Sequence, residues 1–139
     1  MRFTQTLFRR TTMYGFNVTI NATMQAAEEK VREALAAEGF GVLTEIDVQK
    51  VMKAKLDIDR TGYKILGACN PNLAHEAIEA EPDIGLLLPC NVLLREEDGG
   101  KVNVSFMDPV AVLGMVDNPK IAEVAPLVQG KLKNVAASL

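Results

Sequence analysis

The chain has 139 residues, of which 48% are hydrophobic and 24% are charged, and its formal net charge is −3. This length and composition are typical of one globular domain with a core of its own. The acidic balance and the dispersed basic residues argue against a protein that binds nucleic-acid backbones, and no apolar run is long enough to cross a membrane.

The N-terminal residues 1–12 lack the regular patterning of the rest of the chain. We predict that they form a flexible extension and that one α+β domain covers residues 13–139. No hydrophobic region of a secretory signal is present, and the two cysteines are too few for a disulfide framework. We therefore expect a cytoplasmic protein with both thiols reduced.

Strands and helices alternate in the predicted first half of the chain. Apolar alternation and helical spacing predict strands at 16–20, 42–46 and 61–68, and helices at 24–38 and 48–56. Gly39 is the expected left-handed end of the first helix. Asp47 is the expected N-cap of the second helix.

In the second half, we predict a helix at 71–80, strands at 84–88, 92–96 and 101–106, and helices that begin at Pro109 and Pro119. Residues 84–88 are apolar throughout, which favours a central strand buried on both faces. Asp98-Gly99-Gly100 predicts a hairpin, and Pro126 and Gly130 are expected to interrupt the last helix. Together these elements predict an α+β fold with a mostly antiparallel sheet and helices packed on one face.

The strands predicted at 61–68 and 84–88 are joined by a helix, a connection that favours parallel strands. Cys69-Asn70 follows the first of these strands, and Cys90-Asn91 follows the second. In a parallel pair both strands end at the same edge of the sheet. We therefore expect the two Cys-Asn segments to lie close together.

These two segments also carry a resemblance to a known family. The runs 67–71 and 87–91, Gly-Ala-Cys-Asn-Pro and Leu-Leu-Pro-Cys-Asn, together with 39–48, closely resemble the prokaryotic domain-of-unknown-function family 302, over residues 13 to about 113. The resemblance implies a compact α+β domain related in architecture to the TATA-binding-protein fold. It implies no DNA binding, because a fold does not determine a function, and it implies no particular activity. The family's recurrent positions correspond to Glu45, Asp47, Lys55, Cys69, Asn70, Pro71, Pro89, Cys90 and Asn91.

Cys69, Asn70, Cys90 and Asn91 form the candidate site. The favoured interpretation is a small-molecule or partner-binding module, because no complete set of catalytic residues is present. The alternative is a thiol-dependent enzyme or redox protein, in which a helix N-terminus lowers the pKa of Cys69 and Cys90 assists. Each residue also has a structural explanation: the thiols as core packing, Asn70 as a helix cap, and Asn91 as a local backbone partner.

The secondary candidates are Glu45, Asp47, Lys55 and His75. Paired carboxylates can perform acid–base chemistry when one of them is buried. His75 follows Cys69 by six residues, an awkward spacing for direct contact. Two cysteines and one histidine leave a tetrahedral metal site one ligand short, so we predict no metal and no cofactor. The apolar residues after Pro119 either pack on the sheet or pair with a second copy, which leaves a homodimer open.

Overall fold

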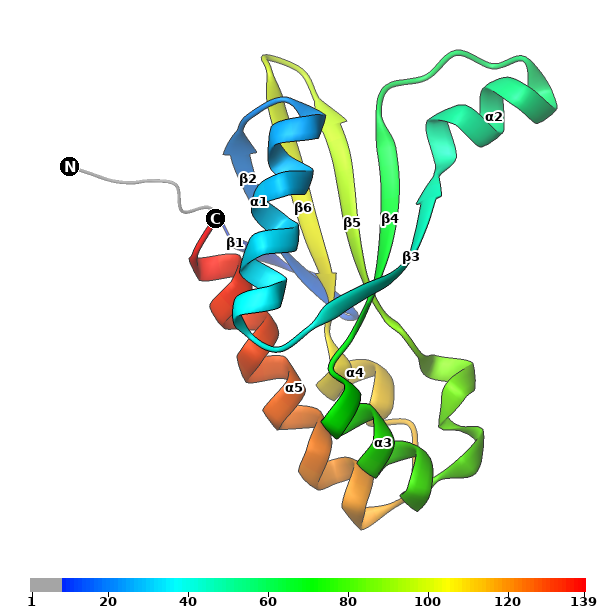
Figure 1. Ribbon diagram of the computed structural model, residues 1–139, viewed down its shortest axis with the longest axis vertical. Helices are drawn as coiled ribbons and strands as arrows, with labels where there is room; N and C mark the ends of the chain where they lie inside the picture. Colours follow the sequence, from blue (N-terminus) through cyan, green and yellow to red (C-terminus); the bar gives the residue numbers. More distant parts are fainter. Residues whose placement is uncertain (1–8) are drawn as a thin grey trace.

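The computed structural model describes residues 9–139. Its strands form one six-stranded sheet in the order β1-β2-β6-β5-β4-β3 (Figure 1). All neighbouring strands in it are antiparallel. The strands are β1 (Arg9–Thr11), β2 (Gly15–Asn21), β3 (Gly41–Asp47), β4 (Tyr63–Cys69), β5 (Cys90–Glu97) and β6 (Lys101–Met107). The helices are α1 (Met24–Ala37), α2 (Val48–Leu56), α3 (Pro71–Ala80), the 3-10 helix η2 (Pro82–Leu87), α4 (Pro109–Leu113) and α5 (Pro119–Ala137).

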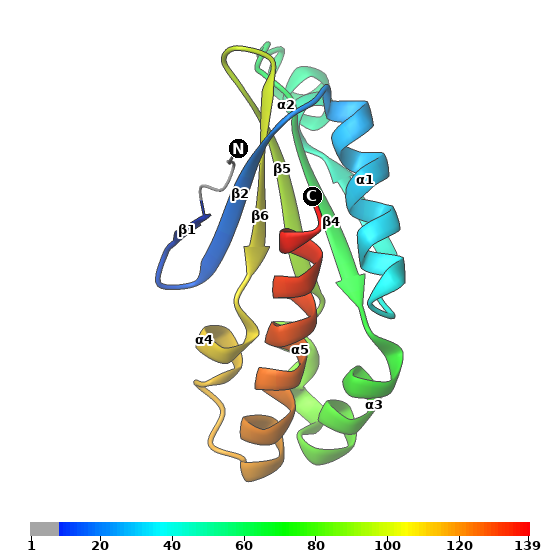
Figure 2. The same ribbon diagram turned by 90° about the vertical axis from the view of Figure 1, so that its left-hand side faces the viewer.

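The main core lies between one face of the sheet and the helices α1 and α5, which cover the same face (Figure 2). Side chains alternate along each strand, so Val102, Val104 and Phe106 of β6 all point into this core. The helices contribute a buried stripe that includes Val31 and Leu132. The predicted α+β class and the antiparallel sheet are thereby confirmed, while the likeness to the TATA-binding-protein architecture stays a prediction.

A second, smaller core lies at one end of the sheet. There Ala77 of α3, Ile84 of η2 and Leu113 of α4 pack against Ile121 and Ala125 of α5. The helix α2 projects from the opposite end of the molecule (Figure 1). The prediction that the helices pack on one face therefore holds for α1 and α5 but not for the helices at the two ends.

The strand predicted at 84–88 is wrong. Residues 82–87 form η2, in which Ile84 is buried while Leu86 is 87% exposed. A short apolar run has no periodicity of its own and fits a buried strand or a helical turn equally well. Pro82 starts the turn directly after α3, and β5 instead begins at Cys90.

The predicted interruption of the last helix is also wrong, because α5 continues through Pro126 and Gly130. Pro126 removes one helical hydrogen bond, but this residue lies on the exposed side of α5. The opposite side buries an unbroken stripe: Ile121, Val124, Val128, Leu132 and Val135. Neither α5 nor any other described helix combines the length and the apolar character that a membrane span requires.

Part of the predicted N-terminal extension belongs to the sheet. Residues 9–11 form β1, which pairs antiparallel with β2 from Arg9↔Val18 to Thr11↔Phe16. A tight turn joins the two strands, in which the Thr12 N–H donates to the Gly15 carbonyl at 2.7 Å. The rest of the predicted extension, residues 1–8, lies outside the described residues.

Candidate functional site

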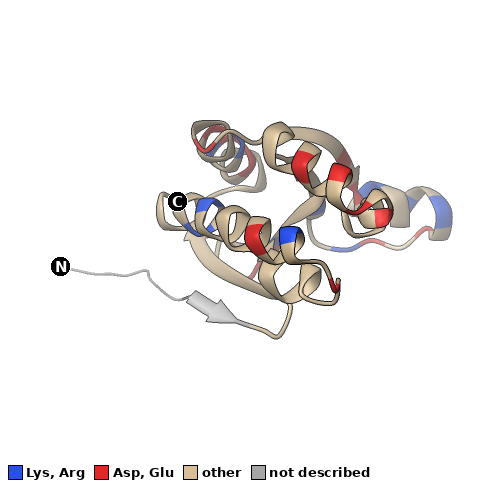
Figure 3. Ribbon diagram, turned by 90° about the horizontal axis from the view of Figure 1, so that it is seen from below, with Lys and Arg blue, Asp and Glu red and all other residues tan. Residues whose placement is uncertain are grey.

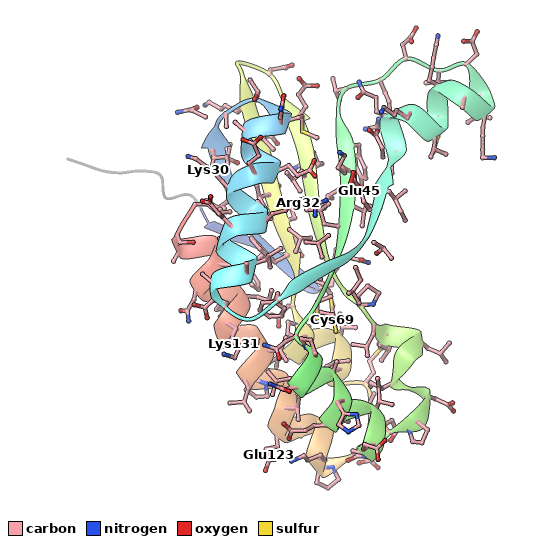
Figure 4. The ribbon with its side chains drawn as sticks, in the orientation of Figure 1. Lys30, Arg32, Glu45, Cys69, Glu123 and Lys131 are labelled. Carbon is pink, nitrogen blue, oxygen red and sulfur yellow. The ribbon has the colours of Figure 1, made fainter. Side chains whose placement is uncertain are left out.

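The two cysteines lie side by side at one end of the sheet, although not by the predicted parallel arrangement. β4 and β5 are antiparallel neighbours, and Ala68 is paired with Cys90. Cys69 is the last residue of β4, where the chain enters α3 (Figure 4). Cys90 is the first residue of β5. Antiparallel strands bring the end of one beside the start of the next, so the expected proximity is reached by the opposite topology.

A pocket of about 340 Å³ lies at this end of the sheet, between β3, α3, η2 and α5. Its polar lining groups are Thr44, Cys69, Asn70 and Cys90, and the remainder of the wall is apolar. None of the described residues that line the pocket is charged. The apolar walls come from every element around it and include Phe40, Leu73, Ala77, Leu88, Leu113 and Val128.

Both thiols are held in the protonated form by this apolar environment. Burial raises the pKa of Cys69, and burial together with the neighbouring Cys69 thiol raises the pKa of Cys90 to about 11. Both are free cysteines, and Cys90 is only 6% exposed. This direction is opposite to the lowered pKa that the thiol-chemistry hypothesis requires at Cys69.

Two of the first backbone positions of α3 have no free N–H group to offer a Cys69 thiolate. The Asn70 side chain accepts a hydrogen bond from the Leu73 N–H at 3.3 Å, and Pro71 has no N–H to offer. The predicted cap at Asn70 is thus confirmed. Its amide nitrogen also lies 3.5 Å from the Glu38 carbonyl oxygen, so Asn70 joins the start of α3 to the end of α1.

Sequence reasoning missed Thr44, which lines the pocket, and Gly67, which lies against Thr44. A side chain at Gly67 would collide with the Thr44 hydroxyl and with the ring of Pro89. The Leu88–Pro89 peptide is cis, and β3 has an irregularity between Val42 and Thr44. A glycine within a predicted strand often marks such a close approach, and this signal was available in the Gly-Ala-Cys run.

Asn91 is separated from the other three candidate residues. Because successive side chains of a strand point to opposite faces, Asn91 faces away from the pocket that Cys90 lines. Asn91 is exposed and borders a different hollow, on the sheet face opposite α1 and α5, together with Leu93 and Ser105. The structure therefore brings Cys69, Asn70 and Cys90 together and leaves Asn91 outside.

Glu45 belongs to a network of four charged side chains that join α1 to the β3 edge of the sheet (Figure 4). Its carboxylate accepts from Arg32 at 3.2 Å and from Lys64 at 3.1 Å. Glu28 completes the network, with contacts of 2.9 Å to Arg32 and 2.8 Å to Lys64. Burial acts to raise the pKa of Glu28, but the hydrogen bonds from Lys64 and Arg32 outweigh it and lower that pKa. The geometry of Glu45 thus indicates a structural role.

The remaining secondary candidates also lie away from the cysteine pocket. Asp47 caps α2 by accepting from the Lys50 N–H at 3.0 Å, as predicted. Lys55 on α2 and His75 on α3 are both exposed. Within residues 9–139, no group of three or more His, Cys, Asp or Glu side chains is placed to hold a metal ion.

Comparison with known proteins places these features in a family. No curated protein matches the chain. The chain is similar to the uncharacterized conserved protein DUF302 from Bacillus stearothermophilus, whose crystal structure shares 27% sequence identity with it at a TM-score of 0.83. That match covers 91% of this chain and 98% of the other. The family model described as "Domain of unknown function DUF302" matches residues 16–139, which includes α5, a helix that the sequence resemblance left outside its best-matched part. The chain therefore belongs to the DUF302 family.

Proposed function

We propose that the protein is a binding module for a compact, uncharged, largely apolar small molecule. The observation that carries this proposal is the pocket of about 340 Å³ at the end of the sheet, where Cys69, Asn70 and Cys90 meet. Pockets for small ligands have volumes of roughly 300–1,000 Å³, apolar walls and a few polar groups that orient the ligand. This pocket has all three properties.

The wall chemistry supports the ligand class. An ionised ligand would lose its hydration in the pocket and find no opposite charge among the residues that line it, which is costly in free energy. An aromatic or short aliphatic molecule would instead gain about 25 cal/mol for each Å² of apolar surface that it buries. Thr44 and Asn70 are the groups that would bind one polar atom of the ligand.

The rim of the pocket has exposed apolar side chains that support ligand binding. Leu43 of β3 and Ile78 of α3 border the pocket and are 67% and 42% exposed. Large apolar side chains at a pocket mouth lose exposure when a ligand binds. The protonated thiols of Cys69 and Cys90 then serve as polarisable contacts. Thiol-dependent catalysis has less support, because burial raises the pKa of both groups.

The proposal is tested with a neutral fluorescent probe, N-phenyl-1-naphthylamine, titrated into the full chain. We expect saturable binding with increased fluorescence. Ala74 lies in the pocket wall on α3, so Ala74→Phe should fill the pocket and weaken probe binding at least about tenfold, equivalent to about 1.4 kcal/mol.

The matched control is Ala122→Phe, a helical alanine that is exposed on α5 and does not line the pocket. This variant should bind the probe as the unmodified protein does. Equal probe affinity in the Ala74 variant and the control, with both proteins folded by circular dichroism, would exclude the pocket as the binding site.

A further inference from the structure

The segment 41–60, which we call the arm, contacts the main core through the half-buried Val42. It consists of β3, α2 and the loop that follows, and α2 projects away from the rest of the molecule (Figure 1). None of the described residues of β3 or α2 is buried. The arm nevertheless carries four large apolar side chains that are 48–67% exposed: Leu43, Ile46, Leu56 and Ile58.

α2 is covered only in part by packing within one chain, where Val48, Val51 and Met52 are half-buried. It is a helix of nine residues, and isolated helices shorter than about 12–15 residues are marginal in water. Most helices in proteins are stabilised by burying one face. Leu56 in the last turn of this short helix and Ile58 after it leave apolar surface that a second molecule can cover.

β3 is an edge strand, because it pairs only with β4 in the described sheet. Its outer backbone N–H and C=O groups are a template for another strand. Edge strands are commonly protected by proline, lysine or a bulge. β3 has an irregularity between Val42 and Thr44 and the charged residues Glu45 and Asp47, but no proline or lysine, and residues 44–47 pair regularly with β4.

The arm as a whole carries four basic and four acidic residues, but the helices at the two ends of β3 differ in charge. α2 carries three lysines and no carboxylate, whereas residues 71–87, which form α3 and η2, carry four carboxylates and no lysine or arginine (Figure 3). Lys50 and Lys55 form no ion pair with any described residue, and the same is true of Glu79 and Asp83. Exposed apolar side chains accompany the acidic residues, namely Ile78 and Leu86.

We propose that two copies of this chain associate about a twofold axis beside the middle of β3. The outer edges of the two β3 strands then pair antiparallel, which twofold symmetry requires of a strand that pairs with itself. α2 and the α3–η2 region lie at opposite ends of β3 on the same side of the molecule (Figure 1). The axis exchanges those ends, so it places the basic α2 of each copy against the acidic α3 and η2 of the other.

A second copy is the partner that the charges favour, because both halves of the complementary contact are present on one chain. Twofold symmetry forms the contact twice and leaves no edge strand unpaired at the junction. It also covers Leu43, which lies on the rim of the apolar pocket. The proposed dimer does not require a bound ligand, because none of the contacts between the two copies involves the interior of the pocket.

The mass of the full chain in solution tests the proposal by sedimentation equilibrium. We expect twice the chain mass of 15.1 kDa at micromolar concentration. The double variant Lys50→Glu/Lys55→Glu should raise the dissociation constant at least about tenfold, and Glu79→Lys/Asp83→Lys should do the same. Combining all four substitutions should restore the dimer to within about threefold of the original affinity.

The matched control is Lys30→Glu/Lys131→Glu, which makes the same change in charge on α1 and α5 and should leave the dimer intact. A protein that sediments as a monomer at about 100 μM would overturn the proposal. A dimer that neither charge reversal weakens would also overturn it, because the contact would then lie elsewhere. Hydrogen exchange gives an independent measurement that does not depend on the variants: amides of β3 should be protected at high but not at low protein concentration.

Discussion

β5 and β3 belong to the same sheet and are separated only by β4, yet their surroundings differ almost completely. In β5, Cys90, Val92 and Leu94 are buried and alternate with more exposed residues. In β3, none of the seven described residues is buried. β5 lies between two strands and under helices, whereas β3 has one neighbour and no helix that covers its residues fully.

This difference shows that the two strands are held by different forces. β5 is held by the removal of apolar side chains from water, and β3 is held by hydrogen bonds to β4 and by the ion pairs of Glu45. Stability within one domain is not uniform, and segments with few buried contacts open most easily. The arm is therefore the region whose order responds most to a partner and to salt.

The largest expected effect concerns the core strand. Leu94→Ala should reduce the free energy of unfolding by about 2–5 kcal/mol, because the fully buried side chain leaves a cavity. Leu56→Ala on the arm should change it by less than about 0.5 kcal/mol, since that side chain is 62% exposed. Urea denaturation of both variants at low protein concentration measures the two values, and similar losses would contradict the contrast between core and arm.

An intermediate effect concerns pH at the start of β5. The pKa of Cys90 is raised to about 11 in the folded protein, against about 8.5 for an unfolded cysteine. A raised pKa means that this stabilisation is fully present below the unfolded pKa and is lost as pH rises through the folded pKa. Between about pH 8.5 and 11, Cys90 should account for a loss of about 3 kcal/mol.

Urea denaturation across this pH range compares the unmodified protein with Cys90→Ala, whose profile should be flatter. Cys69→Ala is the matched control, because the Cys69 thiol is less buried and should flatten the profile less. Parallel profiles for all three proteins would show that Cys90 ionises normally in the folded state.

The smallest expected effect concerns the ion pairs that link the arm to α1. Glu28→Gln removes one carboxylate, and with it two ion pairs of the network, and should cost about 0.5–1 kcal/mol at pH 7 and low salt. The pKa of Glu28 is lowered on folding, so its contribution is present above the unfolded pKa of about 4.3 and is lost as pH falls through the folded pKa.

Thermal denaturation at pH 7 and below pH 4 measures this difference. Glu29→Gln is the matched control, because Glu29 is exposed on the same helix and forms no ion pair with any described residue. Hydrogen exchange in β3 should also be faster in the Glu28 variant. If both substitutions had an equal effect, or if hydrogen exchange in β3 stayed unchanged, the ion-pair network would not be what stabilises the arm.

Local signals predicted most of the elements correctly. The caps at Asp47, Asn70, Asp108 and Asn118 all accept backbone hydrogen bonds at the predicted helix starts, and the hairpin between β5 and β6 forms at Gly99 and Gly100 with positive φ. Each of these signals acts over a few residues, so a short stretch of sequence contains all the interactions that decide it.

The candidate site was predictable only in part. Cys69, Asn70 and Cys90 do meet at one pocket, but the expected parallel strands are antiparallel and Asn91 faces the opposite side. The error came from assigning residues 84–88 to a strand. Whether this apolar run forms a strand depends on which of its side chains the rest of the fold buries, and in η2 only Ile84 is buried.

By itself, the sequence determined the class of the domain, the strands and helices with strong periodicity, and the turns and caps whose hydrogen bonds are local. The tertiary structure decided the strand order, the continuity of α5 through Pro126, and the apolar pocket that keeps the thiols of Cys69 and Cys90 protonated. The physical reason is the range of the interactions. Burial and its effect on a pKa depend on side chains that are distant along the chain, such as Phe40 and Val128, which line the same pocket as Cys69. No local pattern records which of these side chains will meet.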